Sequence, residues 1–390
     1  MKEKLICTFP GCDMMPPIFM GDRDIYAVTW AGAFHFHDGS MHTLLDFEAL
    51  GRIALPRNNI YNPYMHGGGP HPPLLVNDAI YILSEKSVGA VPPILSIFSR
   101  TDELLQEVEL EIRSVRWMGA SDDHLFTLGY QQAFVMDTSG RCLHKVDIDW
   151  QSMDKTPAVI YKDSMLFIDK KDGGYWLFRL FADGTLEAVH RIAGYEVMCP
   201  AKDFVVSGSE IYLQWFAVGE LEFEGSAFFI FREYEPGRLL LRKCLLLGGQ
   251  NEDGILKGGF PGGFCVNGDS LLYTDDYMSV KRTKADRFPS VPNGIYGRLI
   301  TASTVDGTYT AVKIPFDFHK VAPAPIIALK DGTIASKWYS DQDYPLYVVQ
   351  RDGTWQAGPT RRAQYLVKYN EQIYACDVGG KNSKIRQIQF

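Results

Sequence analysis

The sequence predicts an all-β fold built from repeated copies of one four-stranded unit, and three observations predict it. Apolar runs of strand length alternate with short polar turns along the whole chain of 390 residues. The pattern recurs about every 50 residues, a period typical of repeat architectures. Asp-Gly turns separate the later runs of several copies, and glycine accepts the positive φ of a tight hairpin at little cost.

Each copy begins with an apolar run, passes a polar turn and enters a second run centred on one position. That position is aromatic in seven copies and alanine in one. Its occupants are Tyr26, Tyr81, Phe126, Phe167, Tyr212, Tyr273, Ala335 and Tyr374. A third run, a tight turn such as Asp38-Gly39 or Asp306-Gly307, and a fourth run follow. Eight copies of four strands predict a β-propeller with eight blades.

One window fits two structures. Between Asp102 and Ile112 the apolar residues fit one face of an amphipathic helix, but they also alternate as in a strand. The place of this window in the repeat predicts a strand.

The ends of the chain complement each other. The eighth copy, at residues 364–390, stops after its third strand, and residues 3–10 resemble the fourth strands of other copies. We expect the N-terminal strand to complete the last blade, because closure removes exposed sheet edges. A single propeller domain would then span residues 1–390, with seven blades or two stacked sheet domains as alternatives.

The sequence resembles β-propeller repeat proteins at the level of the superfamily, over nearly its whole length. It has no Trp-Asp blade signature, no kelch motif and no run of sialidase Asp-boxes. The resemblance therefore implies a fold and no particular activity.

Composition excludes some classes of partner. Lys and Arg number 39 against 47 Asp and Glu, so the net charge is −8, whereas binding to nucleic acid usually needs a basic excess. The sequence contains no run of 18 apolar residues, so it predicts no membrane-spanning helix. The seven cysteines are odd in number and form no Cys-x-x-Cys pair, which predicts reduced thiols in a cytoplasmic protein.

Loop length predicts where a site lies. In a four-stranded blade the first and third turns share one face, and here they are short, whereas the other connections are long, as at residues 51–70. Long loops on a rigid scaffold concentrate binding residues, so we expect a site on the long-loop face, over the central channel.

Basic residues before the first strands predict the chemistry of that site. The candidate catalytic residues are His66 and His71. The candidate ligand-binding residues are Tyr64, Arg116, Lys155, Lys257, His319, Arg361 and Arg362. A basic ring in an acidic protein predicts a small anionic ligand, with solvated loop charges as the alternative.

Two functions from different classes stay open. Histidine near a bound anion suits a lyase, an isomerase or a hydrolase. The alternative is a non-enzymatic platform for protein partners, with Tyr277, Phe288 and Trp338 as possible anchors. The sequence does not decide whether the protein is an enzyme, and no motif identifies a cofactor: Gly67-Gly68-Gly69 is not followed by Lys-Ser or Lys-Thr.

A pair of histidines lies elsewhere. Alternation places His35 and His37 on one face of a third strand, near Asp38 and His42, and two imidazoles on one face can bind a divalent metal. Third strands lie away from a propeller's channel, however, and the end of this one approaches the short turns. We therefore expect no catalytic metal at this position, and no metal site elsewhere.

Overall fold

The computed structural model describes residues 2–55, 70–86, 92–112, 115–129, 131–148, 158–192, 201–218, 224–247, 256–280, 292–314, 326–329, 332–336, 345–350, 354–360, 363–377 and 381–389. Strands and turns make up these residues, so the predicted all-β class is confirmed. No helix in this part of the chain is long and apolar enough to cross a membrane.

The chain divides into two compact units, which are described separately. One contains residues 3–191 and 367–390, and the other contains residues 1–2 and 192–366. That all 390 residues form one domain stays a prediction.

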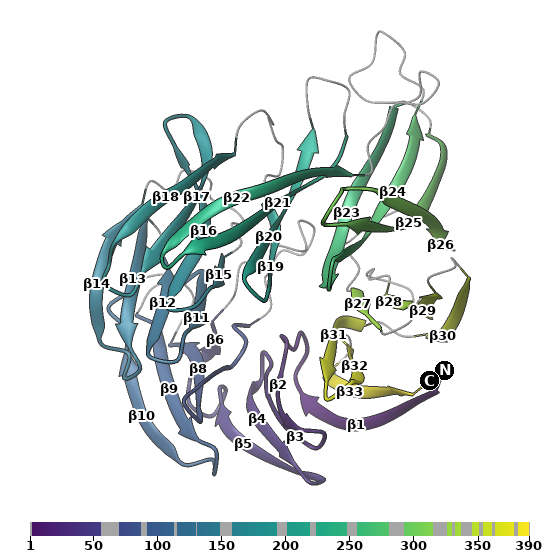
Figure 1. The fold of residues 1–390 in the computed structure, drawn as a ribbon. Coiled ribbons are helices and arrows are strands. Elements are labelled where there is room, and N and C mark those ends of the chain that lie inside the picture. Colours follow the sequence, from purple (N-terminus) through teal and green to yellow (C-terminus); the bar gives the residue numbers. More distant parts are fainter. Residues whose placement is uncertain are drawn as a thin grey trace. The chain divides into compact units, whose positions relative to one another are not determined.

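The first unit holds the sheets of the first four copies and of the last copy (Figure 1). The first sheet has β2 (Ile18–Gly21), β3 (Asp24–Val28), β4 (Gly32–His37) and β5 (Ser40–Asp46). The second has β6 (Ile53–Ala54), β7 (Leu74–Val76), β8 (Ala79–Glu85), β9 (Ile94–Ser99) and β10 (Leu104–Glu109). The third has β11 (Trp117–Ala120), β12 (His124–Leu128), β13 (Gln132–Asp137) and β14 (Cys142–Asp147). The fourth has β15 (Ala158–Ile160), β16 (Ser164–Lys171), β17 (Gly174–Phe181) and β18 (Leu186–Ile192).

The second unit holds three further four-stranded sheets. One has β19 (Ala201–Ser207), β20 (Glu210–Val218), β21 (Glu224–Glu235) and β22 (Arg238–Leu247). The next has β23 (Leu256–Asn267), β24 (Ser270–Val280), β25 (Pro292–Ser303) and β26 (Tyr309–Ile314). The third has β27 (Ile326–Ala328), β28 (Gly332–Ser336), β29 (Pro345–Gln350) and β30 (Trp355–Thr360).

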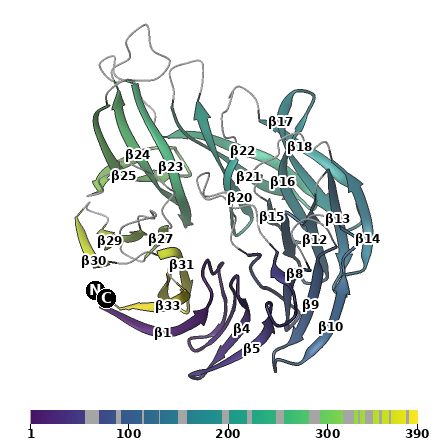
Figure 2. The same cartoon turned by 180° about the vertical axis from the view of Figure 1, so that it is seen from behind.

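The last sheet joins the two ends of the chain. Its order is β1 (Lys2–Pro10), β33 (Asn382–Gln389), β32 (Gln372–Asp377) and β31 (Ala363–Tyr369). β1 lies along β33 in both views (Figures 1 and 2). Glu3 of β1 forms an ion pair with Arg386 of β33, at 3.6 Å between oxygen and nitrogen.

The second sheet corrects the expected strand count. Seven sheets have four strands, but this one has five, so the expectation of eight four-stranded blades is wrong in this copy. β7 pairs with the first half of β8, while β6 pairs with Ser84 and Glu85 at its far end. Proline supplies no N–H to a ladder, so Pro72 and Pro73 prevent β7 from extending backwards, and β6 pairs there instead.

The repeat itself is confirmed in each copy. The position found by its spacing lies on the second strand of the seven four-stranded sheets and on β8 of the five-stranded sheet, and its seven aromatic residues are buried. The ambiguous window forms β10, so the predicted strand is confirmed. Cores fill the space between neighbouring sheets, as where Val28 and Leu45 pack with Ile80 and Phe98. The sheet order along the chain is that of a β-propeller.

Candidate functional site

Two of the residues expected at the channel mouth lie among the described side chains. His71 precedes β7, and its backbone N–H donates to Leu55 O at 2.9 Å. Arg116 precedes β11, and its backbone N–H donates to Leu128 O at 2.8 Å. β7 and β11 contact each other, so the structure brings the starts of these two inner strands into one region of the first unit.

The remaining predicted site residues, or their side chains, lie outside the part of the chain that the structure describes. His66, Tyr64, Lys155, His319, Arg361 and Arg362 lie outside the described residues, and Lys257 lies in β23 with its side chain outside them. The proposed anchors Tyr277, Phe288 and Trp338 also fall outside the described side chains. Their roles stay predictions.

Burial separates His71 from Arg116. His71 is only 2% exposed, whereas Arg116 is half-buried. A ligand on the surface would therefore reach the guanidinium first, and would reach the imidazole only after a local opening. The catalytic role of His71 stays a prediction.

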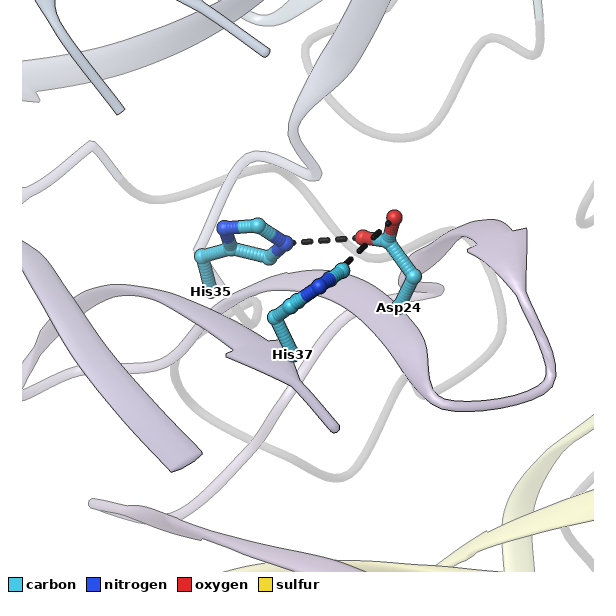
Figure 3. Close-up of side chains that lie close together, drawn as sticks. All are labelled: Asp24, His35 and His37. Atoms are coloured by element: carbon cyan, nitrogen blue, oxygen red, sulfur yellow. Dashed lines mark hydrogen bonds and ion pairs between the residues drawn. The ribbon is translucent and has the colours of Figure 1, made fainter. Parts of the chain in front are cut away.

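The densest group of chemically active side chains lies in the first sheet, at the end where its short turns lie. The register pairs Asp24 with His37 and Tyr26 with His35 between β3 and β4, and pairs His35 with His42 between β4 and β5. Residues paired across strands point to the same face, so these five side chains share one face of the sheet. Figure 3 shows Asp24, His35 and His37 turned toward one another.

His35 is the buried centre of this group. Its Nε2 lies 2.7 Å from Asp24 Oδ1, and its Nδ1 lies 2.7 Å from Asp102 Oδ1. Asp102 comes from the turn between β9 and β10 of the next sheet, and it has a positive φ of 65°. Each ring nitrogen of His35 therefore faces a carboxylate oxygen, with Asp24 on one side and Asp102 on the other.

The other two histidines form the exposed rim. His37 Nδ1 lies 3.5 Å from Asp24 Oδ2, and His42 Nδ1 lies 3.9 Å from Asp102 Oδ2. Both imidazoles are more than half exposed. Each carboxylate is therefore shared between buried His35 and one histidine that faces solvent.

Tyr26 holds the ring of His35 in place. The two rings stack at 3.9 Å between centroids and 9° between planes, and the Tyr26 hydroxyl donates to Arg100 O at 3.0 Å. Burial, together with the charges of Asp102 and Asp24, raises the pKa of Tyr26. Tyr26 therefore stays neutral and positions His35 rather than exchanging protons.

Sequence reasoning found part of this group. Alternation identified His35 and His37, and Asp24, His35 and His37 together offer donor atoms that lie within 4.8 Å of one another. Asp24 could have been found, because it lies two residues before the repeated aromatic position and a hairpin pairs it with His37. Asp102 carries no local signal, because it comes from the next copy of the repeat.

The equivalent position in the second unit carries Glu210, two residues before Tyr212 and paired with Arg232. Arg232 Nη2 lies 2.8 Å from Glu210 Oε1, Arg242 also forms an ion pair with this carboxylate, and the Tyr212 hydroxyl donates to it at 2.6 Å. Burial raises the pKa of Glu210, but the hydrogen bonds from Tyr212 and Arg242 and the charges of both arginines outweigh burial and hold it below its usual value.

Comparisons with known proteins support the fold alone. No protein-family model matches the chain, and no curated protein matches it. The computationally designed protein Ika8 has a TM-score of 0.57 at 10% identity, with 98% of this chain and 99% of that chain covered. Dihydro-heme d1 dehydrogenase NirN in complex with DHE has a TM-score of 0.55 at 9% identity, with 96% and 75% covered. The WD40 domain of Neurospora crassa Pan2 has a TM-score of 0.44 at 11% identity, with 82% and 90% covered.

At such low identities these similarities concern architecture. The sheet order shows that the chain has a β-propeller fold, and Ika8 and NirN share its architecture.

Proposed function

We propose that this β-propeller binds a small anionic molecule at the end of the sheets where the inner strands begin. The observation that carries the proposal is that the described inner strands β7 and β11 contact each other and are preceded by His71 and Arg116. A guanidinium donates paired hydrogen bonds to a carboxylate or phosphate, and the proposal assigns this role to half-buried Arg116.

Catalysis is the extension of this proposal. An imidazole beside a bound anion can transfer protons in a lyase, isomerase or hydrolase reaction. NirN supports this extension only in that a protein of similar fold is a dehydrogenase with a bound ligand. His71 is the residue we would test first.

Arg116→Ala should abolish binding of the anion while leaving the fold intact, because the side chain is half-buried and lies outside the strands. The measurement is a thermal-shift screen of small carboxylates and phosphate esters, followed by calorimetry of each hit. Arg141→Ala is the matched control, since Arg141 lies in a short turn of the same unit and is largely exposed. Hits that bind Arg116→Ala as tightly as wild type would refute the assignment.

A protein-interaction platform is the second candidate. Leu104 and Leu105 are adjacent on the outer strand β10 and are 47% and 56% exposed. An apolar outer strand offers a surface and an edge to another chain, and a second copy is the simplest partner. Replacing both leucines with lysine should then abolish self-association in sedimentation; a wild type that is monomeric at high concentration would contradict this candidate.

We also propose that β1 closes the repeat as the outer strand of the last sheet. Phe9 and Cys7 of this strand are buried, and Ser383 Oγ donates to Gly11 O at 3.0 Å. Deleting residues 1–9 should lower the free energy of unfolding by at least about 3 kcal/mol, since a buried phenylalanine alone contributes about 1.5–3 kcal/mol. Deleting only residues 1–2 is the control, and equal unfolding curves for both truncations would disprove closure.

A further inference from the structure

The side chains of Asp24, His35 and His37 form a group that the proposed ligand site does not use. They lie at the end of the first sheet formed by its short turns, whereas the inner strand β2 begins at the opposite end. Two imidazoles and one carboxylate are ligands that first-row divalent metals prefer.

We propose that Asp24, His35 and His37 bind one divalent transition-metal cation, with Zn²⁺ the species that best suits them. Zinc binds nitrogen and oxygen at about 2.0–2.2 Å in a tetrahedron, which places neighbouring ligand atoms about 3.3 Å apart. Asp24 Oδ1 lies 2.7 Å from His35 Nε2, Asp24 Oδ2 lies 3.5 Å from His37 Nδ1, and one donor atom from each of the three residues lies within 4.8 Å of the others. Small side-chain movements bring the three atoms onto one ion.

The contacts around His35 are those of a metal ligand. A ligating histidine normally donates its other ring N–H to a carboxylate, which fixes the tautomer and the ring orientation. Asp102 Oδ1 lies within hydrogen-bond distance of His35 Nδ1, at 2.7 Å, and Tyr26 stacks on the imidazole ring. His35 Nε2 is thereby directed at Asp24.

Charge balance favours a cation in this place. His35 lies between two carboxylates, those of Asp24 and Asp102, and each of them has an oxygen 2.7 Å from one of its ring nitrogens. A divalent cation bound by Asp24 and His35 would offset the charge of these two carboxylates.

The ion can enter and keep a fourth ligand. The His37 imidazole is 54% exposed, and the Asp24 side chain is 33% exposed, so the ligands face solvent on one side. Water completes the tetrahedron there, without further movement of the chain.

Two other positions in the chain show that the fold does not require this combination of one carboxylate and two histidines. Glu210, at the equivalent position, has arginine partners, and guanidinium groups do not bind metals. His124 forms a two-residue pair with Asp163, at 2.9 Å between Nδ1 and Oδ1. The first copy has a carboxylate with two histidines on one face.

The test is Zn²⁺ binding by chelator-treated, thiol-reduced full-length protein, measured by competition with a chromogenic chelator and by metal analysis. Wild type should take up one equivalent. His37→Gln, at the exposed rim where folding is safe, and Asp24→Asn should each weaken binding on the order of 100-fold, and Asp102→Asn should weaken it about 10–100-fold. His124→Gln is the matched control and should bind as wild type does.

The spectrum of the Co²⁺ form separates this site from the cysteines. Ligation by histidine and aspartate gives visible bands without the strong near-ultraviolet bands of thiolate ligation, and His37→Gln should remove the visible bands. A wild type that takes up no Zn²⁺, or variants His37→Gln and Asp24→Asn that bind as tightly as wild type, would overturn the proposal. Small-molecule binding through Arg116 is measured separately and does not depend on this result.

Discussion

Asp24 and Glu210 occupy the same place in two copies of the repeat but have different partners. Each begins the second strand of its sheet and lies two residues before a buried tyrosine. The residue opposite on the third strand is His37 in the first case and Arg232 in the second. The fold therefore accepts a carboxylate at this place with either imidazole or guanidinium partners.

The difference between the partners is chemical. A guanidinium keeps its charge at all ordinary pH values and has no lone pair for a metal, so the Glu210 group can only be an ion pair. Imidazole can lose its proton and can bind a metal, so the Asp24 group can change state. The comparison predicts that one group stabilises the fold and that the other carries chemistry.

Removing the carboxylate from the Glu210 group should give the largest effect. Glu210→Gln leaves Arg242, which is mostly buried, without its anion, and loss of one partner of a buried pair is strongly destabilising. Because both arginines are partly exposed, we expect a loss of about 2–4 kcal/mol in urea unfolding.

Glu235→Gln is the control for this variant. Glu235 pairs with Arg238 on the surface of the same hairpin, and such pairs contribute about 0–1 kcal/mol. Equal losses for the two variants would show that the Glu210 group is no more than a surface ion pair.

Asp24→Asn should cost less, about 1–2 kcal/mol in metal-free protein, because the new amide has both a donor and an acceptor for a hydrogen bond with His35 Nε2. The measurement is the same urea series at neutral pH. Asp163→Asn, in the two-residue pair with His124, provides the reference for an exposed pair. If Asp24→Asn destabilises the chain as much as Glu210→Gln does, imidazole and guanidinium partners are equivalent here.

The smallest expected effect is the pH dependence of the contribution that Glu210 makes to the free energy of unfolding. Its pKa is lowered in the folded state, so its stabilisation is complete above the usual value near 4.5 and is lost as pH falls through the folded value. The difference in unfolding free energy between wild type and Glu210→Gln should be constant above about pH 5.5 and should shrink below about pH 4.5. A difference that grows on acidification would mean that burial, not the arginines, controls this carboxyl.

Much of the first sheet's surface could be predicted from the sequence. Period-two alternation placed His35 and His37 on one face, and the repeat located Tyr26 on the strand beside them. The expectation of no metal there used the distance of third strands from a channel and the approach of this strand's end to the short turns. It did not include Asp24 or Asp102, because pairing of strands and packing of sheets bring those carboxylates to His35.

The sequence by itself determined the all-β class, the repeat and the buried position that recurs in each copy. These follow from local alternation, turn residues and spacing, which each segment carries within itself. Tertiary structure alone decided the fifth strand of the second sheet, the burial of His71 and the placement of Asp102 against His35. Each of these depends on contacts between segments far apart in the chain. Prolines prevent β7 from forming further backbone hydrogen bonds with β8, and the turn that carries Asp102 contacts the face of the neighbouring sheet.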